Sequence, residues 1–226
     1  MRIKISHFGK WKNMKNNIIR RFKEIGIIPV IALEHKEDAS LLADALCKGG
    51  LPAAEITFRT REAAACIKEM RASHPDMLVG AGTILSTAQV DEAISAGAQF
   101  IVSPGFDEEV VKYCIQKDIP VVPGTATATD VQAAYKLGLN FVKVFPAEIL
   151  GGIKMIKAIA APYNMMTFMP SGGVSEKNMD AYLKEDIILC VGGSWMVKKD
   201  LIDNKEFDTI EALSREARSR FEKIRG

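Results

Sequence analysis

Short apolar runs recur along the chain every 20 to 26 residues and alternate with amphipathic stretches of helical spacing. Several runs are nearly continuous in Val, Ile and Leu, which is typical of strands that are covered on both faces. Strands that alternate with helices in this way pair in parallel through right-handed crossovers. The predicted strands are Ile27–Ala32, Ala53–Phe58, Met77–Ala81, Gln99–Ser103, Ile119–Pro123, Asn140–Phe145, Met165–Pro170 and Ile187–Val191.

The amphipathic stretches between these runs predict helices. Ser86 and Thr129 indicate helix starts, because their hydroxyls accept hydrogen bonds from the free N–H groups of a first turn. A densely charged stretch with helical spacing, Glu206–Ile224, is expected on the outside of the molecule. The other predicted helices are Lys36–Lys48, Arg61–Ser73, Ser86–Ala96, Asp107–Lys117, Thr129–Leu137, Ile153–Ala160 and Lys177–Lys184.

Eight strand–helix units favour a closed (β/α)8 TIM barrel over an open, doubly wound sheet. The first predicted strand is not followed by the G-x-G-x-x-G motif of dinucleotide-binding open sheets. The length of 226 residues suits one barrel domain. We therefore expect a single domain over residues 1–226, with a basic helical segment at 1–26, the barrel strands within 27–195 and a C-terminal helical segment at 196–226.

Composition and charge are those of a soluble globular protein, with 48% hydrophobic and 26% charged residues and a net charge of +2. Nothing in this balance indicates a nucleic-acid partner. The first 23 residues carry eight Lys or Arg and no acid; an arm on an anionic surface and a helix closing one end of the barrel are both open, and the helix is favoured. Without a membrane-length apolar run or a signal segment, we expect no membrane partner and a cytoplasmic location.

No metal or cofactor is expected from the cysteines and histidines. Cys47, Cys66, Cys114 and Cys190 are widely spaced, and the three histidines show no H-E-x-x-H spacing. The cysteines are most simply small buried apolar side chains in a reducing compartment. Catalysis would then depend on carboxylate, amine and hydroxyl groups.

Lys143 is the most informative candidate, because it lies within an otherwise apolar run from Phe141 to Phe145. Strand alternation places it on one face with both of these phenylalanines. An apolar environment disfavours the charged form of a lysine and makes the free amine available. A free amine attacks a keto group to form an iminium, the electron sink for carbon–carbon cleavage. A lysine that forms a salt bridge or points outward is the alternative.

Glu55 lies in a second apolar run and shares a face with Thr57. A buried carboxylate is costly unless it is paired or used, so structural pairing is one interpretation. The other is a proton shuttle for the formation, dehydration and cleavage steps of a Schiff-base aldolase.

The polar and aromatic residues at the ends of the other strands suit substrate binding, because barrel active sites lie at the C-terminal strand ends. The guanidinium of Arg59 suits the carboxylate of a keto acid, whereas its competitor Arg61 fits the following helix better. Thr83 has a hydroxyl for the same carboxylate, or caps a turn. Pro104 and Phe145 are expected to shape the pocket.

Two glycine pairs, Gly172-Gly173 and Gly192-Gly193, follow the last two predicted strands. Barrels commonly bind phosphate at this place through backbone N–H groups, and Ser194 adds a hydroxyl. Each pair alone also serves any tight turn. Together they favour a phosphate site.

These segments closely resemble the 2-keto-3-deoxy-6-phosphogluconate (KDPG) / 4-hydroxy-2-oxoglutarate aldolase family. They match in order from residue 28 to residue 195, which makes the resemblance far more specific than any one motif. The matching stretches are Ile28–Ile31, Glu55–Thr60, Val79–Thr83, Gly97–Gly105, Ile119–Gly124, Val142–Glu148, Pro170–Gly173 and Val191–Trp195.

The resemblance implies a class I aldolase that works without a metal or cofactor, usually as a homotrimer. It implies a Schiff base at Lys143, proton transfer by Glu55, and contacts of Arg59 and Thr83 with the pyruvate carboxylate. The substrate would be the phosphorylated 2-keto acid derived from gluconate, or its galactonate epimer, which is split into pyruvate and glyceraldehyde 3-phosphate. A further substrate would be 4-hydroxy-2-oxoglutarate, which is split into pyruvate and glyoxylate.

The phosphate end implied by the resemblance consists of Gly173, Gly193 and Ser194. Two residues depart from the family pattern. Ser171 stands where a threonine is common, which keeps a hydroxyl in the pocket wall but leaves the preferred epimer open. Val144 stands where an aromatic is usual and points away from the cavity by alternation.

Two other functions stay open on the sequence. A sugar-phosphate isomerase or epimerase barrel would share the phosphate site but needs paired acid and base groups and no iminium lysine. A non-catalytic barrel that binds a phosphorylated ligand would have little reason to keep Lys143, Glu55 and Arg59 together.

Overall fold

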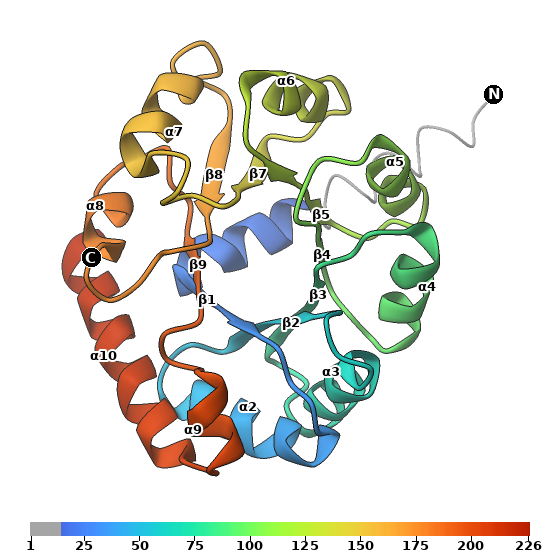
Figure 1. The fold of residues 1–226 in the computed structure, drawn as a ribbon, viewed down its shortest axis with the longest axis vertical. Coiled ribbons are helices and arrows are strands. Elements are labelled where there is room, and N and C mark those ends of the chain that lie inside the picture. The colour runs from blue at the N-terminus through green and yellow to red at the C-terminus, as the bar shows by residue number, and fades with distance from the viewer. Residues whose placement is uncertain (1–14) are drawn as a thin grey trace.

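The strands form a ring of parallel strands with the helices outside it (Figure 1), in a computed structural model that describes residues 15–226. Nearly all strand residues are buried, as the continuous apolar runs predict. The strands are β1 (Ile27–Ile31), β2 (Ala53–Thr57), β3 (Leu78–Gly82), β4 (Ile101–Val102), β5 (Val121–Val122), β6 (Gly124–Thr125), β7 (Phe141–Val144), β8 (Thr167–Pro170) and β9 (Val191–Gly193).

These strands occupy eight positions around the ring, because β5 and β6 lie on one continuous stretch: β5 is within the predicted strand Ile119–Pro123, and β6 follows it directly. One sheet has the order β5-β4-β3-β2-β1-β9 and the other β6-β7-β8. Pro123 separates β5 from β6 because it has no N–H for the ladder, yet its carbonyl accepts from Lys143 N at 2.9 Å. On the other side, Phe168 of β8 bridges Ile188 in the approach to β9. The ring is therefore closed, as a (β/α)8 barrel.

The last strand differs from its prediction. The apolar run Ile187–Val191 was expected to be the strand, but β9 begins only at Val191 and continues through Gly192 and Gly193. The earlier residues pair with β8, whereas β9 pairs with β1, where Ile28 lies opposite Gly192. The two glycines therefore belong to the ladder itself and not to the loop after it.

The helices follow the predicted stretches closely, with one start misplaced. Ser86 is an N-cap as predicted, and its hydroxyl accepts from Gln89 N. The N-cap of the sixth helix is Thr127, not Thr129, because Thr127 and Asp130 satisfy each other's backbone N–H groups in a capping box. The helices are η1 (Lys36–Asp38), α2 (Ala39–Lys48), α3 (Ala63–Ser73), α4 (Thr87–Ser95), α5 (Glu108–Gln116), α6 (Ala128–Lys136), α7 (Gly152–Ala160), α8 (Met179–Leu183), α9 (Lys199–Asp203) and α10 (Phe207–Arg225).

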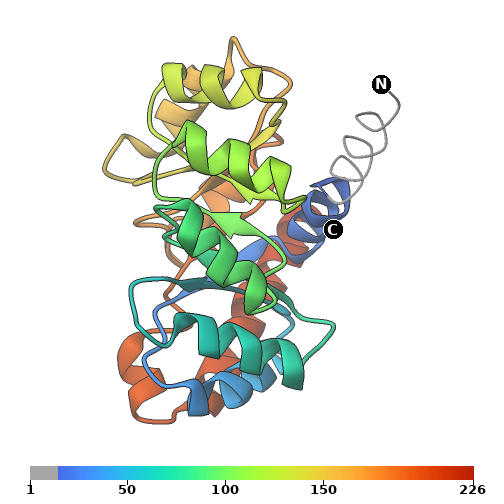
Figure 2. The same ribbon diagram turned by 90° about the vertical axis from the view of Figure 1, so that its right-hand side faces the viewer.

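A helix of residues 15–25 closes the end of the barrel where the strands begin (Figure 2). Phe22 is fully buried, and its ring lies 4.9 Å from that of Phe100 and 5.4 Å from that of Phe141. Both partners stand at strand starts, β4 and β7. The prediction that the basic segment contributes a closing helix is confirmed for residues 15–25; residues 1–14 lie outside the described part of the chain.

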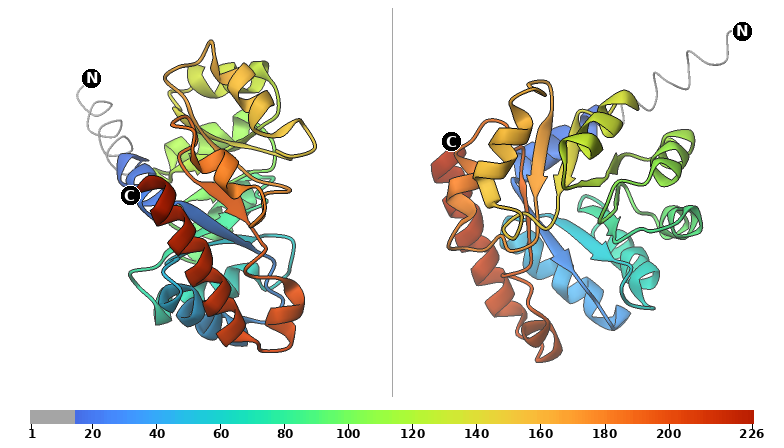
Figure 3. Two further views of the ribbon diagram at one scale, coloured as in Figure 1. Left: turned by 90° about the vertical axis from the view of Figure 1, so that its left-hand side faces the viewer. Right: turned by 45° about the horizontal axis from the view of Figure 1, so that its top comes forward.

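The C-terminal helix α10 runs along the outside of the barrel beside α2 (Figure 3), as predicted for the charged C-terminal stretch. Its last residue, Arg225, donates to the carbonyl of Ile188 at 2.6 Å and so ties the helix to the segment before β9. Within residues 15–226, no helix combines the length and the apolar character that membrane crossing requires.

Candidate active site at the C-terminal strand ends

A buried contact between an amine and a carboxylate lies inside the barrel. Lys143 Nζ donates to Glu55 Oε1 at 3.2 Å, and the two residues are 5% and 0% exposed. Lys143 comes from β7 and Glu55 from β2, which are four positions apart in a ring of eight and therefore face each other across it. The structure thus brings together the two residues that the sequence singled out for chemistry.

The second oxygen of Glu55 has no partner among the described residues. Oε2 is buried and accepts no hydrogen bond there. Because buried carboxylate oxygens are normally hydrogen-bonded, such an atom marks a place where a ligand or water binds. One Glu55 oxygen therefore holds the amine while the other remains available.

Two glycines on β3 make room inside the barrel. A Cβ atom at Gly82 would lie 2.6 Å from Glu55 Cγ and would overlap Oε1 as well. A Cβ at Gly80 would meet the Phe100 ring at 2.5 Å. Because Gly80 and Gly82 have no side chains, the Phe100 ring and the Glu55 carboxylate can occupy the space beside the inner face of β3.

Phe145 and the segment of Pro104 both lie close to the lysine strand. Lys143 Nζ lies 5.2 Å from the centroid of the Phe145 ring, and Phe145 itself is exposed. Pro104 follows β4, and its carbonyl lies where a Cβ of Gly124 would be. Gly124 is the register partner of Lys143, so the Pro104 loop approaches the lysine strand closely.

The candidate carboxylate-binding groups lie at the ends of β2 and β3. Arg59 is exposed, and its Nε donates to the Thr57 hydroxyl at 3.2 Å. Thr83 directly follows β3 and has a φ of 58°, a left-handed conformation that is strained for a β-branched residue. Such strain costs of the order of 1–3 kcal/mol and is concentrated at functional sites. Arg61 precedes α3 in a turn and is exposed.

The glycine pair after β8 is packed against residues that follow the lysine strand. Gly172 and Gly173 have φ angles of 85° and 87°, which favour glycine. A Cβ at Gly172 would meet the Phe145 ring at 3.0 Å, and one at Gly173 would meet Glu148 Cβ at 2.6 Å. Ser171, the residue before the pair, is buried.

The second glycine pair adjoins the first. A Cβ at Gly192 would lie 3.0 Å from Ser171 Oγ, and one at Gly193 would overlap the Trp195 ring. Ser194 is exposed and follows directly. The two segments therefore converge at the end of the barrel that also holds Lys143.

The buried thiol of Cys190 is held in its neutral form. Burial raises the pKa of the Cys190 thiol well above its usual value, and the charge of Glu55 raises it further. A neutral thiol is a weak nucleophile. The described residues contain no cluster of three His, Cys, Asp or Glu side chains arranged to hold a metal.

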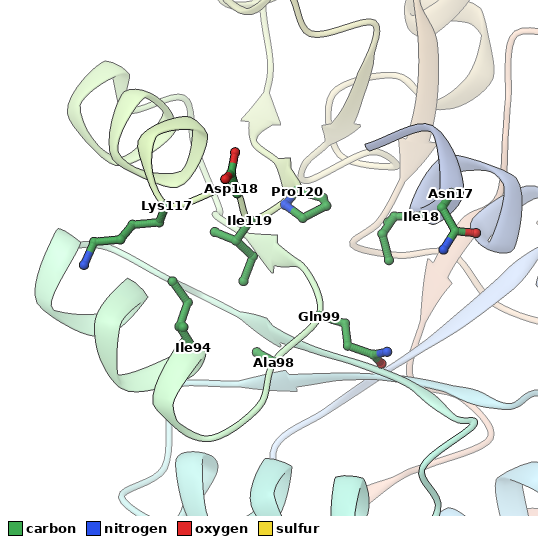
Figure 4. A pocket seen from close by; sticks show the side chains of 9 residues that line it. All are labelled: Asn17, Ile18, Ile94, Ala98, Gln99, Lys117, Asp118, Ile119 and Pro120. Atoms are coloured by element: carbon green, nitrogen blue, oxygen red, sulfur yellow. The ribbon is translucent and has the colours of Figure 1, made fainter. Parts of the chain in front are cut away.

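A large cavity lies at the other end of the barrel and does not include the predicted site. Its volume is about 370 Å³, and it lies beside the helix of residues 15–25 (Figure 4). Lys143, Glu55 and the other predicted site residues are absent from its lining. The candidate site is therefore identified by the contact between the amine and the carboxylate, and not by the size of a cavity. The lining residues are Asn17, Ile18, Ile94, Ala98, Gln99, Lys117, Asp118, Ile119 and Pro120.

Sequence reasoning missed the residues that make the site fit together. Gly82 and Gly124 each leave space for a residue from another strand or loop. Each stands directly after a predicted strand, Met77–Ala81 or Ile119–Pro123, and a glycine at that place is the available signal. The Glu148–Tyr182 hydrogen bond beside Gly173 was also missed, because its partners are 34 residues apart.

Comparison with known proteins gives consistent results. The sequence profile of the KDPG and KHG aldolase family matches residues 18–213. A 2-dehydro-3-deoxy-phosphogluconate aldolase of Haemophilus influenzae is 45% identical over 199 residues, covering 88% of this chain and 94% of that protein. The KDPG aldolase of Legionella pneumophila, solved with pyruvate as a covalent carbinolamine intermediate, is 37% identical with a TM-score of 0.82, covering 84% of this chain and 93% of that one. The Zymomonas mobilis enzyme, solved with 3-phosphoglycerate, is 38% identical with a TM-score of 0.83, covering 88% and 94%.

The clearance at Gly82 leads to a testable expectation. Gly82→Ala places a methyl group on the Glu55 carboxylate and displaces it from Lys143, so we expect kcat for aldol cleavage to fall by about 10- to 100-fold. The matched control is Gly80→Ala, which overpacks the same strand against Phe100. Both variants should lose about 1–3 kcal/mol of unfolding free energy in urea titrations, but only Gly82→Ala should slow turnover of the folded protein. A wild-type kcat in Gly82→Ala would contradict a role of the Lys143–Glu55 contact in turnover.

Proposed function

Because the chain belongs to the KDPG and KHG aldolase family and is therefore a carbon–carbon lyase, we propose that Lys143 forms a Schiff base with a 2-keto acid. The buried 3.2 Å contact between Lys143 Nζ and Glu55 Oε1 carries the proposal. Attack on a ketone requires the neutral amine. Transfer of one proton across this contact gives a neutral amine and a carboxylic acid without any charge leaving the site.

Glu55 then moves protons through each later step. The amine adds to the keto carbon to give a carbinolamine, and the protonated Glu55 donates to its hydroxyl, which leaves as water. In the resulting iminium, Glu55 removes the proton of the C4 hydroxyl while the C3–C4 bond breaks and its electrons flow into the iminium. The aldehyde departs, and the enamine takes a proton at C3. Hydrolysis releases pyruvate and restores the lysine.

The substrate of this reaction is a phosphorylated six-carbon 2-keto acid, namely KDPG or its galactonate epimer. Arg59 and Thr83 bind the carboxylate, which places the keto carbon beside Lys143, and Pro104 and Phe145 enclose it. Gly172, Gly173, Gly192, Gly193 and Ser194 bind the phosphate end, and Ser171 lines the pocket wall. The convergence of the two glycine pairs supports this assignment. The products are pyruvate and glyceraldehyde 3-phosphate, and unphosphorylated 4-hydroxy-2-oxoglutarate is a further substrate.

Trapping of the covalent intermediate tests the role of Lys143. After incubation with pyruvate and reduction by borohydride, mass spectrometry should find the reduced adduct on the peptide that contains Lys143. Lys143→Ala should give no adduct and lose at least about 10³-fold in kcat, because the electron sink is gone. Lys157, an exposed lysine paired with Glu185, supplies the control variant Lys157→Ala. An adduct on another lysine, or none in the wild type, would refute the proposal.

An isosteric change tests Glu55. Glu55→Gln keeps the shape of the side chain but cannot accept a proton, so we expect kcat to fall by about 10²- to 10⁴-fold, the usual contribution of general acid–base catalysis. A wild-type circular dichroism spectrum at the assay temperature shows that the variant is folded, even if its unfolding temperature is lower. If the folded variant turns over at the wild-type rate, Glu55 serves structural pairing only.

We also propose a homotrimer in the cytoplasm. The apolar side chain of Ile149 is 87% exposed in the loop beside the site, and Leu150 next to it is 37% exposed; both are suited to burial between subunits. The four thiols are unpaired, in keeping with a reducing compartment. Sedimentation equilibrium should give three times the chain mass of 24.8 kDa, and fractionated cells should hold the activity in the cytoplasmic fraction. A monomeric mass, or activity in another fraction, would oppose the respective proposal.

A further inference from the structure

The loop that follows the lysine strand is tied to the glycine pair after β8 by its backbone. Ala147 N donates to Ser171 O at 2.8 Å, and Glu148 N donates to Gly172 O at 3.1 Å. These bonds extend the β7–β8 ladder beyond both strands. The backbone of the Gly172–Gly173 loop is therefore set relative to the strand that carries Lys143.

The Glu148 side chain packs against the same loop. Its Cβ and Cγ lie where a Cβ of Gly173 would be, so its methylene groups pack directly on that glycine. Its Oε1 atom accepts a hydrogen bond from the hydroxyl of Tyr182 on α8. On the far side of the loop, Asn178 Nδ2 donates to Gly173 O at 3.0 Å. The glycine pair is thus held between Glu148 and the residues that lead into α8.

Tyr182, the hydrogen-bond partner of Glu148, is a buried side chain. It is 1% exposed, the largest fully buried side chain of the described residues. Burial, and then the hydrogen bond to Glu148, raise the pKa of the Tyr182 hydroxyl far above its usual value. The hydroxyl is therefore protonated and a hydrogen-bond donor at neutral pH.

The Glu148 carboxylate also lies close to a helix N-terminus. Oε1 lies 3.2 Å from the position of a Cβ on Gly152, the first residue of the nine-residue helix α7. A helix N-terminus carries a partial positive charge and stabilises a nearby carboxylate. A carboxylate so close to a phosphate-binding loop would otherwise repel the ligand.

We propose that Glu148 and Tyr182 form a positioning pair that holds the Gly172–Gly173 loop in its phosphate-binding shape and so sets the preference for phosphorylated substrates. The proposal rests on the proposed function of that loop. Neither residue touches the reacting atoms. Their effect is on the binding of the phosphate end and not on the chemistry at Lys143.

Removal of one hydroxyl tests the pair. In Tyr182→Phe, we expect KM for KDPG to rise about tenfold, the loss expected for one hydrogen bond to a charged group. The kinetic constants for unphosphorylated 4-hydroxy-2-oxoglutarate should change by less than about twofold, because that substrate does not use the loop. The ratio of the two kcat/KM values should therefore fall about tenfold.

Exposed Glu148 supplies a second pair of variants, which keeps the test independent of the folding of Tyr182→Phe. Glu148→Gln retains the acceptor and the packing on Gly173, and should keep the wild-type preference. Glu148→Ala loses both and should lose the preference. Tyr113→Phe is the matched control, because Tyr113 makes the same kind of bond to Asp91, at 2.6 Å, between α5 and α4.

The outcomes separate this proposal from the one on which it rests. A wild type that is trapped by borohydride on Lys143 but shows no preference for the phosphorylated substrate would remove the phosphate assignment, and this proposal with it. A wild type with the preference, whose Tyr182→Phe and Glu148→Ala variants both keep it, would overturn the positioning pair alone. Equal losses for both substrates would also overturn it, since they would indicate general damage to the fold.

Discussion

A hydrogen-bonded amine and carboxylate, buried between opposite strands, is the constraint around which the interior of this barrel is arranged. Removing two charges from water is expensive, and loss of one partner from such a pair typically costs about 3–5 kcal/mol because the other charge remains buried. Lys143 and Glu55 therefore depend on each other, and their strands must keep the spacing that lets them meet. Gly82 leaves space for the Glu55 carboxylate. The phenylalanine cluster around Phe22 fills the end of the barrel where the strands begin.

The sequence predicted the barrel and its two central residues because both depend on local pattern. Continuous apolar runs predict buried parallel strands, and a charged residue inside such a run stands out. What the pattern cannot provide is the contact itself. Lys143 and Glu55 are 88 residues apart, and only closure of the ring shows that β2 and β7 face each other. Taken separately, each residue was equally compatible with a structural role.

The errors in the prediction have identifiable physical causes. The run at Ile187 is as apolar as a strand, but the ladder to β1 is formed by Gly192 and Gly193, whose lack of side chains gives no hydrophobic signal. Thr127 and Thr129 both lie near the start of α6, and the reciprocal bonds with Asp130 make Thr127 the N-cap. The role of a glycine as cleared space depends on which side chain enters from another strand, so it becomes visible only in three dimensions.

The aromatic packing around Phe22 determines at which end of the barrel ligands enter and leave the proposed active site. Phe22, Phe100 and Phe141 pack across one end of the barrel, so the proposed site opens at the C-terminal ends of the strands. In the proposed mechanism, the fragment bound by the outer loops lies nearer that opening after cleavage, whereas the three-carbon fragment is still bonded to Lys143. The aldehyde must leave before water can reach and release its partner. In the proposed mechanism both products therefore leave by the same end of the barrel, and the covalent bond to Lys143 sets the order in which they do so.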